Sequence, residues 1–257
     1  MELRALRRDR AFRRGPELFL HERAFDDCLD RLTLVQRRFG RALLIGCPDP
    51  DWPRRLGAFC EEIDVFDPGR CFAKAAGGAT IVEDRFDAEP GRYDLCLAIG
   101  TLDTVNDLPQ ALARIHLTLG ADGFLLGAMS GGETLPELRA AMRAADQVQG
   151  IAVPHVHPRI EAASLAALLS SAGFANPVVD IDRAHVSYET LRRLIDDLRG
   201  MGATNVLTQR PILSMSGKAL RAAEAAFAAA GNGDRTIETF EILHFAAWTP
   251  ASGLPGR

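Results

Sequence analysis

The chain has 257 residues, of which 47% are hydrophobic and 25% are charged, with 23 Gly and 14 Pro. This composition excludes the collagen-like, low-complexity and disordered classes, and the length suits one α/β domain with a core of its own. The net charge of −4 argues against a nucleic-acid partner, and no run of 18 apolar residues predicts a membrane-spanning helix.

Basic residues are unevenly distributed along the chain. Only Lys74 and Lys218 of the 30 basic residues are lysines, and six arginines fall within residues 1–15. This segment lacks the apolar stretch of a secretory signal and the serines of a transit peptide, so neither is predicted. We expect a solvated, arginine-rich helix or arm, with docking to a partner protein through its charge as the alternative.

The cysteines and histidines predict neither a disulfide framework nor a metal site. The five cysteines are an odd number without CxxC spacing, which favours a reducing, cytoplasmic setting with small buried thiols. His155 and His157 stand two residues apart between prolines, a poor arrangement for joint ligation of one metal ion. We therefore expect no bound metal.

Hydrophobic periodicity predicts elements that alternate along the chain. A helix over 17–39 is followed by strands over 42–46, 62–69, 79–84 and 93–100. Next come a helix over 107–120, a strand over 123–129, helices over 134–149 and 161–172, and a strand over 177–182. Helices near 188–200 and over 218–230 precede a last strand over 236–248.

This alternation is typical of an open, doubly wound α/β sheet. We expect an arginine-rich arm and helix at 1–39, then one sheet domain at 40–257. Residues 183–235 are predicted to form a helical cap before the last strand, long enough to cover a cleft. Ligands of such sheets bind beyond the carboxyl ends of the strands.

Acidic residues follow two neighbouring strands at that edge. Asp67 ends the second predicted strand and Asp84 ends the third. A carboxylate at Asp67 can accept both hydroxyls of a ribose, and one at Asp84 can accept the amino group of an adenine. By themselves these residues are equally consistent with an ordinary turn and a polar loop, so both interpretations stay open.

Several motifs resemble one known enzyme family. They are VNDLP at 105–109, GAM at 127–129, TLPELR at 134–139, DLRGMG at 197–202, and Asn205. With the order of elements and the two acids, they resemble the class I S-adenosylmethionine-dependent methyltransferases. Over about residues 10–248 the closer resemblance is to methyltransferase-like assembly factors of respiratory complex I, and the chain is also similar to malonyl-carrier-protein methyltransferases.

The resemblance implies a Rossmann-like sheet, mostly parallel with an antiparallel last strand, that binds S-adenosylmethionine. It implies cofactor contacts at Gly46, Cys47, Asp67, Asp84, Gly100 and Asp103. For the substrate cleft it implies Asn106, Glu133, His155 and Asn205. The implied substrate is a protein or a carrier, in one variant an arginine of a complex I subunit. Methyl transfer depends mainly on alignment of the reacting groups, so no catalytic residue is assigned.

The loop after the first strand departs from the family pattern. The family has an acid here, followed by Gly-x-Gly-x-Gly. In this chain Leu44 stands at the position of the acid, and Pro48 and Pro50 stand at the positions of the second and third glycines. Proline fixes φ near about −65°, lacks an N–H and adds a ring where the cofactor needs room. Asp103 and Thr104 also replace a His-Trp pair. Two functions therefore stay open: an S-adenosylmethionine-dependent methyltransferase, or a non-catalytic binding or assembly protein with a weakened or lost pocket.

Overall fold

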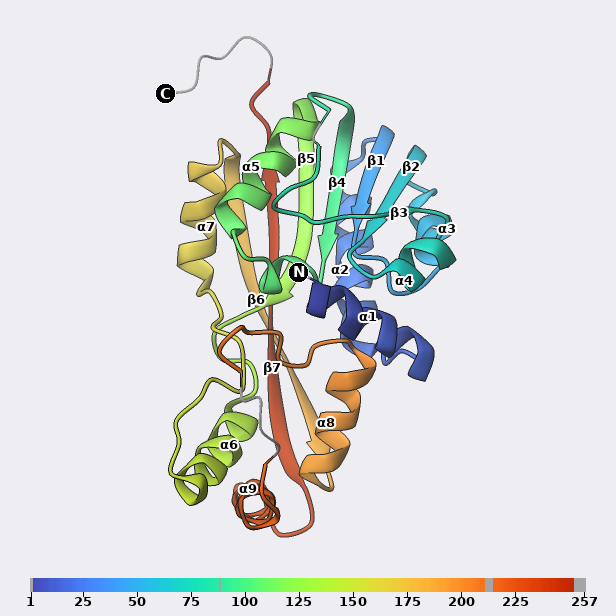
Figure 1. The fold of residues 1–257 in the computed structure, drawn as a ribbon. Coiled ribbons are helices and arrows are strands. Elements are labelled where there is room, and N and C mark those ends of the chain that lie inside the picture. The colour runs from blue at the N-terminus through green and yellow to red at the C-terminus, as the bar shows by residue number, and fades with distance from the viewer. Residues whose placement is uncertain (1, 88, 211–214, 252–257) are drawn as a thin grey trace.

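The computed structural model describes residues 2–87, 89–210 and 215–251 around a seven-stranded sheet (Figure 1). The strands are β1 (Phe39–Ile45), β2 (Cys60–Asp67), β3 (Ala79–Thr80), β4 (Tyr93–Ile99), β5 (Leu119–Ser130), β6 (Ala175–Tyr188) and β7 (Thr236–Trp248). Their order is β3-β2-β1-β4-β5-β7-β6. The first five strands pair in parallel, whereas β7 is antiparallel to both β5 and β6. The predicted sheet, mostly parallel with an antiparallel last strand, is confirmed.

Helices cover both faces of this sheet, as the doubly wound class requires. One face carries α2 (Phe19–Val35) and the short α3 (Trp52–Leu56), and the other carries α5 (Leu108–Thr118) and α7 (Ala162–Ser171). Side chains of β1 alternate between the two cores because successive residues of a strand point to opposite faces. Leu44 packs in the core under α2, whereas Leu43 and Ile45 pack in the core under α5 and α7.

Strand β3 is shorter than the strand predicted over 79–84. Its pairing with β2 ends at Thr80, and the chain then turns away from the sheet. The turn carries Glu83 and Asp84 inward, where they are 0% and 2% exposed. Both acids therefore lie beside the carboxyl edge of the sheet rather than in a longer strand.

The cap forms a separate layer beyond the sheet. Strands β6 and β7 continue past their neighbours as a two-stranded ribbon that is still paired at Tyr188 and Thr236. Helices α6 (Pro136–Gln149), α8 (Leu191–Gly200) and α9 (Gly217–Ala229) surround the far end of the ribbon (Figure 1) and share a core of their own. Helix α6 lies outside the predicted 183–235 cap in sequence but packs against α9 within it.

Helix α1 (Glu2–Arg14) lies across the carboxyl edge of the sheet, between α4 (Arg70–Ala75) and the cap helix α8 (Figure 1). The prediction of a fully solvated arginine-rich helix is wrong for two of its arginines. Arg4 and Arg8 are each 4% exposed because acids of the sheet edge pair with them. The charges of these two arginines are therefore paired within the chain itself, and docking of the segment to a partner protein stays a prediction.

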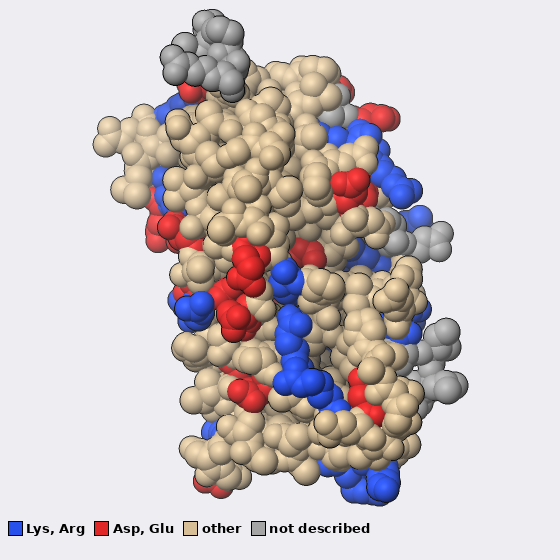
Figure 2. All heavy atoms as spheres, turned by 90° about the vertical axis from the view of Figure 1, so that its left-hand side faces the viewer, with Lys and Arg blue, Asp and Glu red and all other residues tan. Residues whose placement is uncertain are grey.

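The face of the molecule drawn in Figure 2 carries charges of both signs. Figure 2 shows Lys and Arg side chains in a column down the middle of one face, with acidic side chains on either side. Such interspersed charge is typical of a solvated surface.

No helix among the described residues is both long and apolar enough to cross a membrane. The five cysteines are unpaired, and all except Cys71 are buried.

Candidate functional site

The turn after β1 brings the backbone of Gly46 against the neighbouring strand. Gly46 has φ +83°, and a Cβ at this position would lie 2.2 Å from the carbonyl oxygen of Ile99. The next residue, Cys47, is buried, and its backbone N–H donates to Asp67 at 2.9 Å. Burial raises the pKa of the Cys47 thiol to about 12, so this side chain is a neutral packing group.

The chain then enters helix α3, which has a single turn. Trp52 anchors it: the side chain is 0% exposed and stacks on Phe25 with ring centroids 4.2 Å apart. The indole N–H donates to Glu22 at 2.5 Å. The loop of Pro48 and Pro50 is therefore held at both ends, by Gly46 against β4 and by Trp52 in the core.

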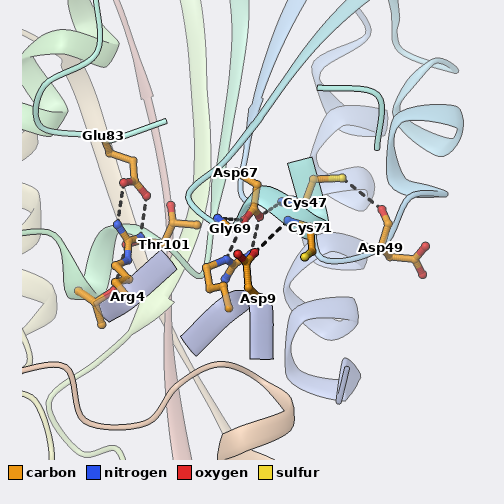
Figure 3. A network of polar contacts seen from close by, with 11 residues as sticks. Arg4, Asp9, Cys47, Asp49, Asp67, Gly69, Cys71, Glu83 and Thr101 are labelled. Carbon is orange, nitrogen blue, oxygen red and sulfur yellow. Dashed lines mark hydrogen bonds and ion pairs between the residues drawn. The ribbon is translucent and has the colours of Figure 1, made fainter. Parts of the chain in front are cut away.

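Asp67, at the end of β2, is completely buried and fully hydrogen-bonded (Figure 3). One carboxylate oxygen accepts from the backbone N–H of Gly69 at 2.7 Å and from Nε of Arg8 at 2.8 Å. The other oxygen accepts from the Cys47 N–H and from Nη2 of Arg8 at 2.5 Å. A carboxylate has about four acceptor positions, so every one of them at Asp67 is occupied.

Glu83 forms a second buried ion pair beside the first (Figure 3). Nη1 and Nη2 of Arg4 donate to its two oxygens at 2.6 and 2.7 Å, and Nη2 also donates to the carbonyl oxygen of Thr101. Asp84, the predicted cofactor residue next to it, is 2% exposed, and its Oδ1 has no hydrogen-bond partner among the described residues. The sequence prediction missed Glu83 as a site residue and chose its neighbour.

A cavity of about 100 Å³ lies next to these ion pairs, between the sheet edge and the cap. Two predicted cofactor residues line it: Gly100, with φ +63° at the end of β4, and Asp103, in the 3₁₀ turn η1 (Leu102–Thr104). Asp103 pairs with Arg159 at 2.6 Å. Burial alone would raise the pKa of Asp103, but Arg159 and Arg4 outweigh it, so that the pKa is lowered and the carboxylate stays charged.

The rest of the cavity wall is mostly apolar and is closed by α2 and the cap. Its lining includes Met129 from β5, Leu198 from α8 and Phe240 from β7. His21 of α2 is one of the polar residues in this wall, with its Nδ1 buried and without a hydrogen-bond partner among the described residues. Burial and the nearby charge of Arg8 lower the pKa of His21 to about 4, so the imidazole is neutral near pH 7.

None of the four predicted cleft residues is among the residues that line this cavity. Asn106 and Glu133 are exposed, and His155 is paired with Asp146 at 2.8 Å. Asn205 donates to the carbonyl oxygen of Pro154 at 2.7 Å and thereby ties the cap loop to the segment before α7. Their contact with a substrate stays a prediction.

Besides Glu83, sequence reasoning missed the site residues Arg4, Arg8, His21 and Arg159. The i, i+4 spacing of Arg4 and Arg8 on one helix face was visible, but six arginines within 15 residues concealed which two are buried. His21 and Arg159 carried no motif. In the part of the chain that the structure describes, no group of three or more His, Cys, Asp or Glu is placed to hold a metal ion.

Residues 18–178 match the family model described as a methyltransferase domain. This chain belongs to the methyltransferase domain family. The arginine-hydroxylase NDUFAF5 of Danio rerio mitochondria is 32% identical over 242 residues, which cover 90% of this chain and 75% of the relative. A malonyl-[acyl-carrier protein] O-methyltransferase of Laribacter hongkongensis is 30% identical over 183 residues, 71% of this chain and 60% of the relative. Both subgroups of the predicted resemblance are thus confirmed as relatives.

Solved structures confirm the fold of this methyltransferase-family chain. The YcgJ protein of Bacillus subtilis matches with a TM-score of 0.57 at 10% identity, over 86% of this chain and 97% of that one. Phosphoethanolamine N-methyltransferase 2 of Haemonchus contortus, solved with S-adenosyl-L-methionine, matches with a TM-score of 0.50 at 14% identity, over 84% of this chain and 50% of that one. At such identities the likeness shows a shared architecture.

S-adenosylmethionine does not fit this edge while α1 is in place. The ribose hydroxyls would need acceptor positions on Asp67, and Arg8 and two backbone N–H groups already fill them. Pro48 and Pro50 replace two positions at which the family has glycine, and neither has an N–H to offer a ligand. Among the described residues, the Oδ1 of Asp84 is an acceptor at this edge without a hydrogen-bond partner. In this arrangement the described residues do not form a nucleoside pocket.

Proposed function

We propose that this chain is a non-catalytic, protein-binding member of the methyltransferase domain family, which holds a protein partner during the assembly of a larger complex. The observation that carries the proposal is the Arg8 guanidinium on Asp67, because the chain's own side chain fills the carboxylate that the nucleoside would need. The relationship to NDUFAF5 and the resemblance to complex I assembly factors support a complex I subunit as the partner.

The charge balance of the edge supports the same proposal. Asp67 and Glu83 are 0% exposed, and a carboxylate buried to this degree needs a compensating charge. Arg8 and Arg4 supply that charge with bidentate geometry. A nucleoside is neutral at these positions, so replacing Arg8 would leave the charge of Asp67 uncompensated. A cytoplasmic location is part of the proposal, although the NDUFAF5 relative is mitochondrial.

Isothermal titration of the full chain with S-adenosylmethionine tests the proposal. We expect no saturable heat up to millimolar cofactor, because Arg8 and the proline loop exclude the nucleoside. A second titration with S-adenosylhomocysteine, the demethylated form, should be equally flat. A methyltransferase known to bind the cofactor provides the control under the same conditions. A dissociation constant in the micromolar range for either ligand would contradict the proposal.

A second candidate is a methyltransferase that acts on a protein or carrier, or in one variant modifies an arginine, after α1 has moved away. The buried Oδ1 of Asp84 favours it: this atom has no hydrogen-bond partner among the described residues, and an adenine amino group would satisfy it. The double variant Arg4→Gln/Arg8→Gln separates the two candidates. Micromolar binding of S-adenosylmethionine by the folded variant would support the enzyme, whereas a flat titration would support the binding protein.

A further inference from the structure

The two buried carboxylates beside α1 form a receptor for a pair of guanidinium groups. Arg4 and Arg8 are one helical turn apart on the same face of α1, and each meets one carboxylate with two hydrogen bonds. Asp67 comes from the end of β2 and Glu83 from the turn after β3, so the spacing of the acids is set by the sheet. The receptor therefore matches the i, i+4 period of a helix.

The Asp67 half of the receptor is oriented independently of α1. The backbone N–H groups of Cys47 and Gly69 orient Asp67 at 2.9 and 2.7 Å, and neither belongs to the helix. Two glycines leave room for the bound arginine. A Cβ on Gly69 would lie 2.8 Å from Cβ of Arg8, and one on Gly202 of the cap would lie 3.3 Å from its Cα.

The receptor also distinguishes arginine from lysine. The fork of a guanidinium matches two carboxylate oxygens at once, which a single ammonium group cannot do. The guanidinium of Arg8 lies 5.1 Å from the centroid of the Phe72 ring, a contact that favours a planar cation. The carbonyl oxygen of Thr101 accepts an additional hydrogen bond from Arg4. These contacts recognise the two arginine side chains, so any helix that carries two arginines at the same spacing can make them.

Helix α1 is attached in a way that permits exchange. Among its described side chains only Arg4, Arg8 and Ala11 are buried, so little apolar surface holds it in place. It is joined to α2 by residues 15–18, which lie outside both helices. Gly15 in this connection has φ +91° and no neighbour within 4 Å of a Cβ placed there. The ion pairs share the attachment with the edge contact of Phe12 on Phe72 and with a hydrogen bond from the Cys71 N–H to Asp9. A competing pair of arginines can replace the ion pairs.

We propose that the Asp67–Glu83 edge is a binding site for an Arg-x-x-x-Arg helix of a partner protein, and that α1 occupies this site until the partner displaces it. The assignment rests on the proposed function in that a protein segment, rather than a nucleoside, is the ligand of this edge. It adds the chemistry by which the partner is recognised. The partner contributes two arginines one turn apart, and the released α1 becomes an exposed basic helix.

The test uses the full-length chain and a fluorescent peptide of residues 2–16 as the probe. In the Arg4→Gln/Arg8→Gln chain, α1 no longer competes for the acids, so we expect the peptide to bind at least about tenfold more tightly than to the wild-type chain. A peptide with Arg4→Gln/Arg8→Gln should lose this binding. The matched control peptide is Arg10→Gln/Arg13→Gln, which has the same net charge as the Arg4→Gln/Arg8→Gln peptide. It should bind like the unaltered peptide, because Arg10 and Arg13 are exposed in α1. Fluorescence anisotropy measures the binding of all three peptides.

Equal binding of the three peptides, or no binding of the unaltered peptide to a folded double variant, would overturn the receptor. If the double variant does not fold, the Arg8→Lys chain takes its place, because it keeps the charge but loses the fork. The unaltered peptide should then bind Arg8→Lys more tightly than wild type, and equal affinities would overturn the assignment. Titration of the same variants with S-adenosylmethionine is a separate readout: cofactor binding would contradict the proposed function, whereas the peptide result alone decides the receptor.

Discussion

At the scale of single residues, the edge of the sheet combines buried charges with the half-buried, neutral imidazole of His21. His21 is enclosed beside Arg8, Asp103 and Asp67, and its Nδ1 has no partner among the described residues. The burial and the cation both disfavour the protonated imidazole, whereas the two carboxylates favour it. The net effect lowers the pKa of His21, so protonation of this residue at low pH destabilises the folded state.

The stability of the chain should therefore fall as the pH falls from about 6.5 to about 4. His21 has its ordinary pKa of 6.5 in the unfolded chain and a pKa of about 4 in the folded chain. In this pH window the unfolded chain therefore binds a proton at His21 that the folded chain does not bind. The shift corresponds to about 3 kcal/mol at its low-pH limit. We expect His21→Asn to lose less stability between pH 7 and pH 4 than wild type, measured by urea unfolding. The exposed His185→Asn is the control, and parallel pH profiles for His21→Asn and wild type would refute the assignment.

At the scale of elements, α1 is a helix held by charge. Its buried ion pairs accompany a small apolar contact, Ala11 and the edge of Phe12 on Phe72, where a surface helix is usually attached by a wide apolar stripe. Buried ion pairs add little net stability compared with apolar packing, but loss of one partner leaves an uncompensated charge. The attachment of α1 is therefore specific without being strong, which suits a segment that exchanges with a partner.

Arg8→Gln should lower the free energy of unfolding by about 3 kcal/mol, because it leaves Asp67 charged and buried without a cation. Asp67→Asn should cost a similar amount, and the two changes together should cost less than their sum. Denaturant unfolding of the two single variants and the double variant measures the coupling. Arg54→Gln, which removes an exposed pair with Asp51, is the matched control and should leave stability unchanged. Strict additivity of the two buried changes would contradict the direct pairing.

At the scale of the whole molecule, the β6–β7 ribbon joins the sheet to the cap. One end of β7 pairs with β5 in the sheet, and the other end passes through the core of the cap. Asn205 adds a hydrogen bond between the cap loop and Pro154. Because both cores share the same strands, we expect the sheet and the cap to unfold together.

Phe227→Ala tests this coupling from within the cap. Phe227 of α9 is 1% exposed in the cap core, so its truncation should cost about 3–5 kcal/mol. Thermal unfolding followed by calorimetry should show one transition that moves to lower temperature. Leu34→Ala, on a residue that is 80% exposed, should leave the transition where it is. Two separate transitions in the Phe227→Ala chain would show that the cap unfolds by itself.

Much of the fold could be predicted from the sequence because its signals are local. The apolar runs at 42–46 and 93–100 form buried parallel strands because helices cover both of their faces. Prediction was weaker at 79–84, where two acids end the run, since β3 stops at Thr80. It missed α6 as part of the cap because the contact of α6 with α9 joins segments far apart in the sequence.

The sequence by itself determined the fold class, the family and the altered loop at Pro48 and Pro50, because periodicity, motifs and the chemistry of proline depend on residues close together in the chain. Only the tertiary structure decided which side chains pair with the acids at the sheet edge. Asp67 and Arg8 are 59 positions apart, and Glu83 and Arg4 are 79 apart. No local rule selects these two among six neighbouring arginines. The folded sheet selects them, because it buries two carboxylates at the spacing of one helical turn and each buried charge requires a partner.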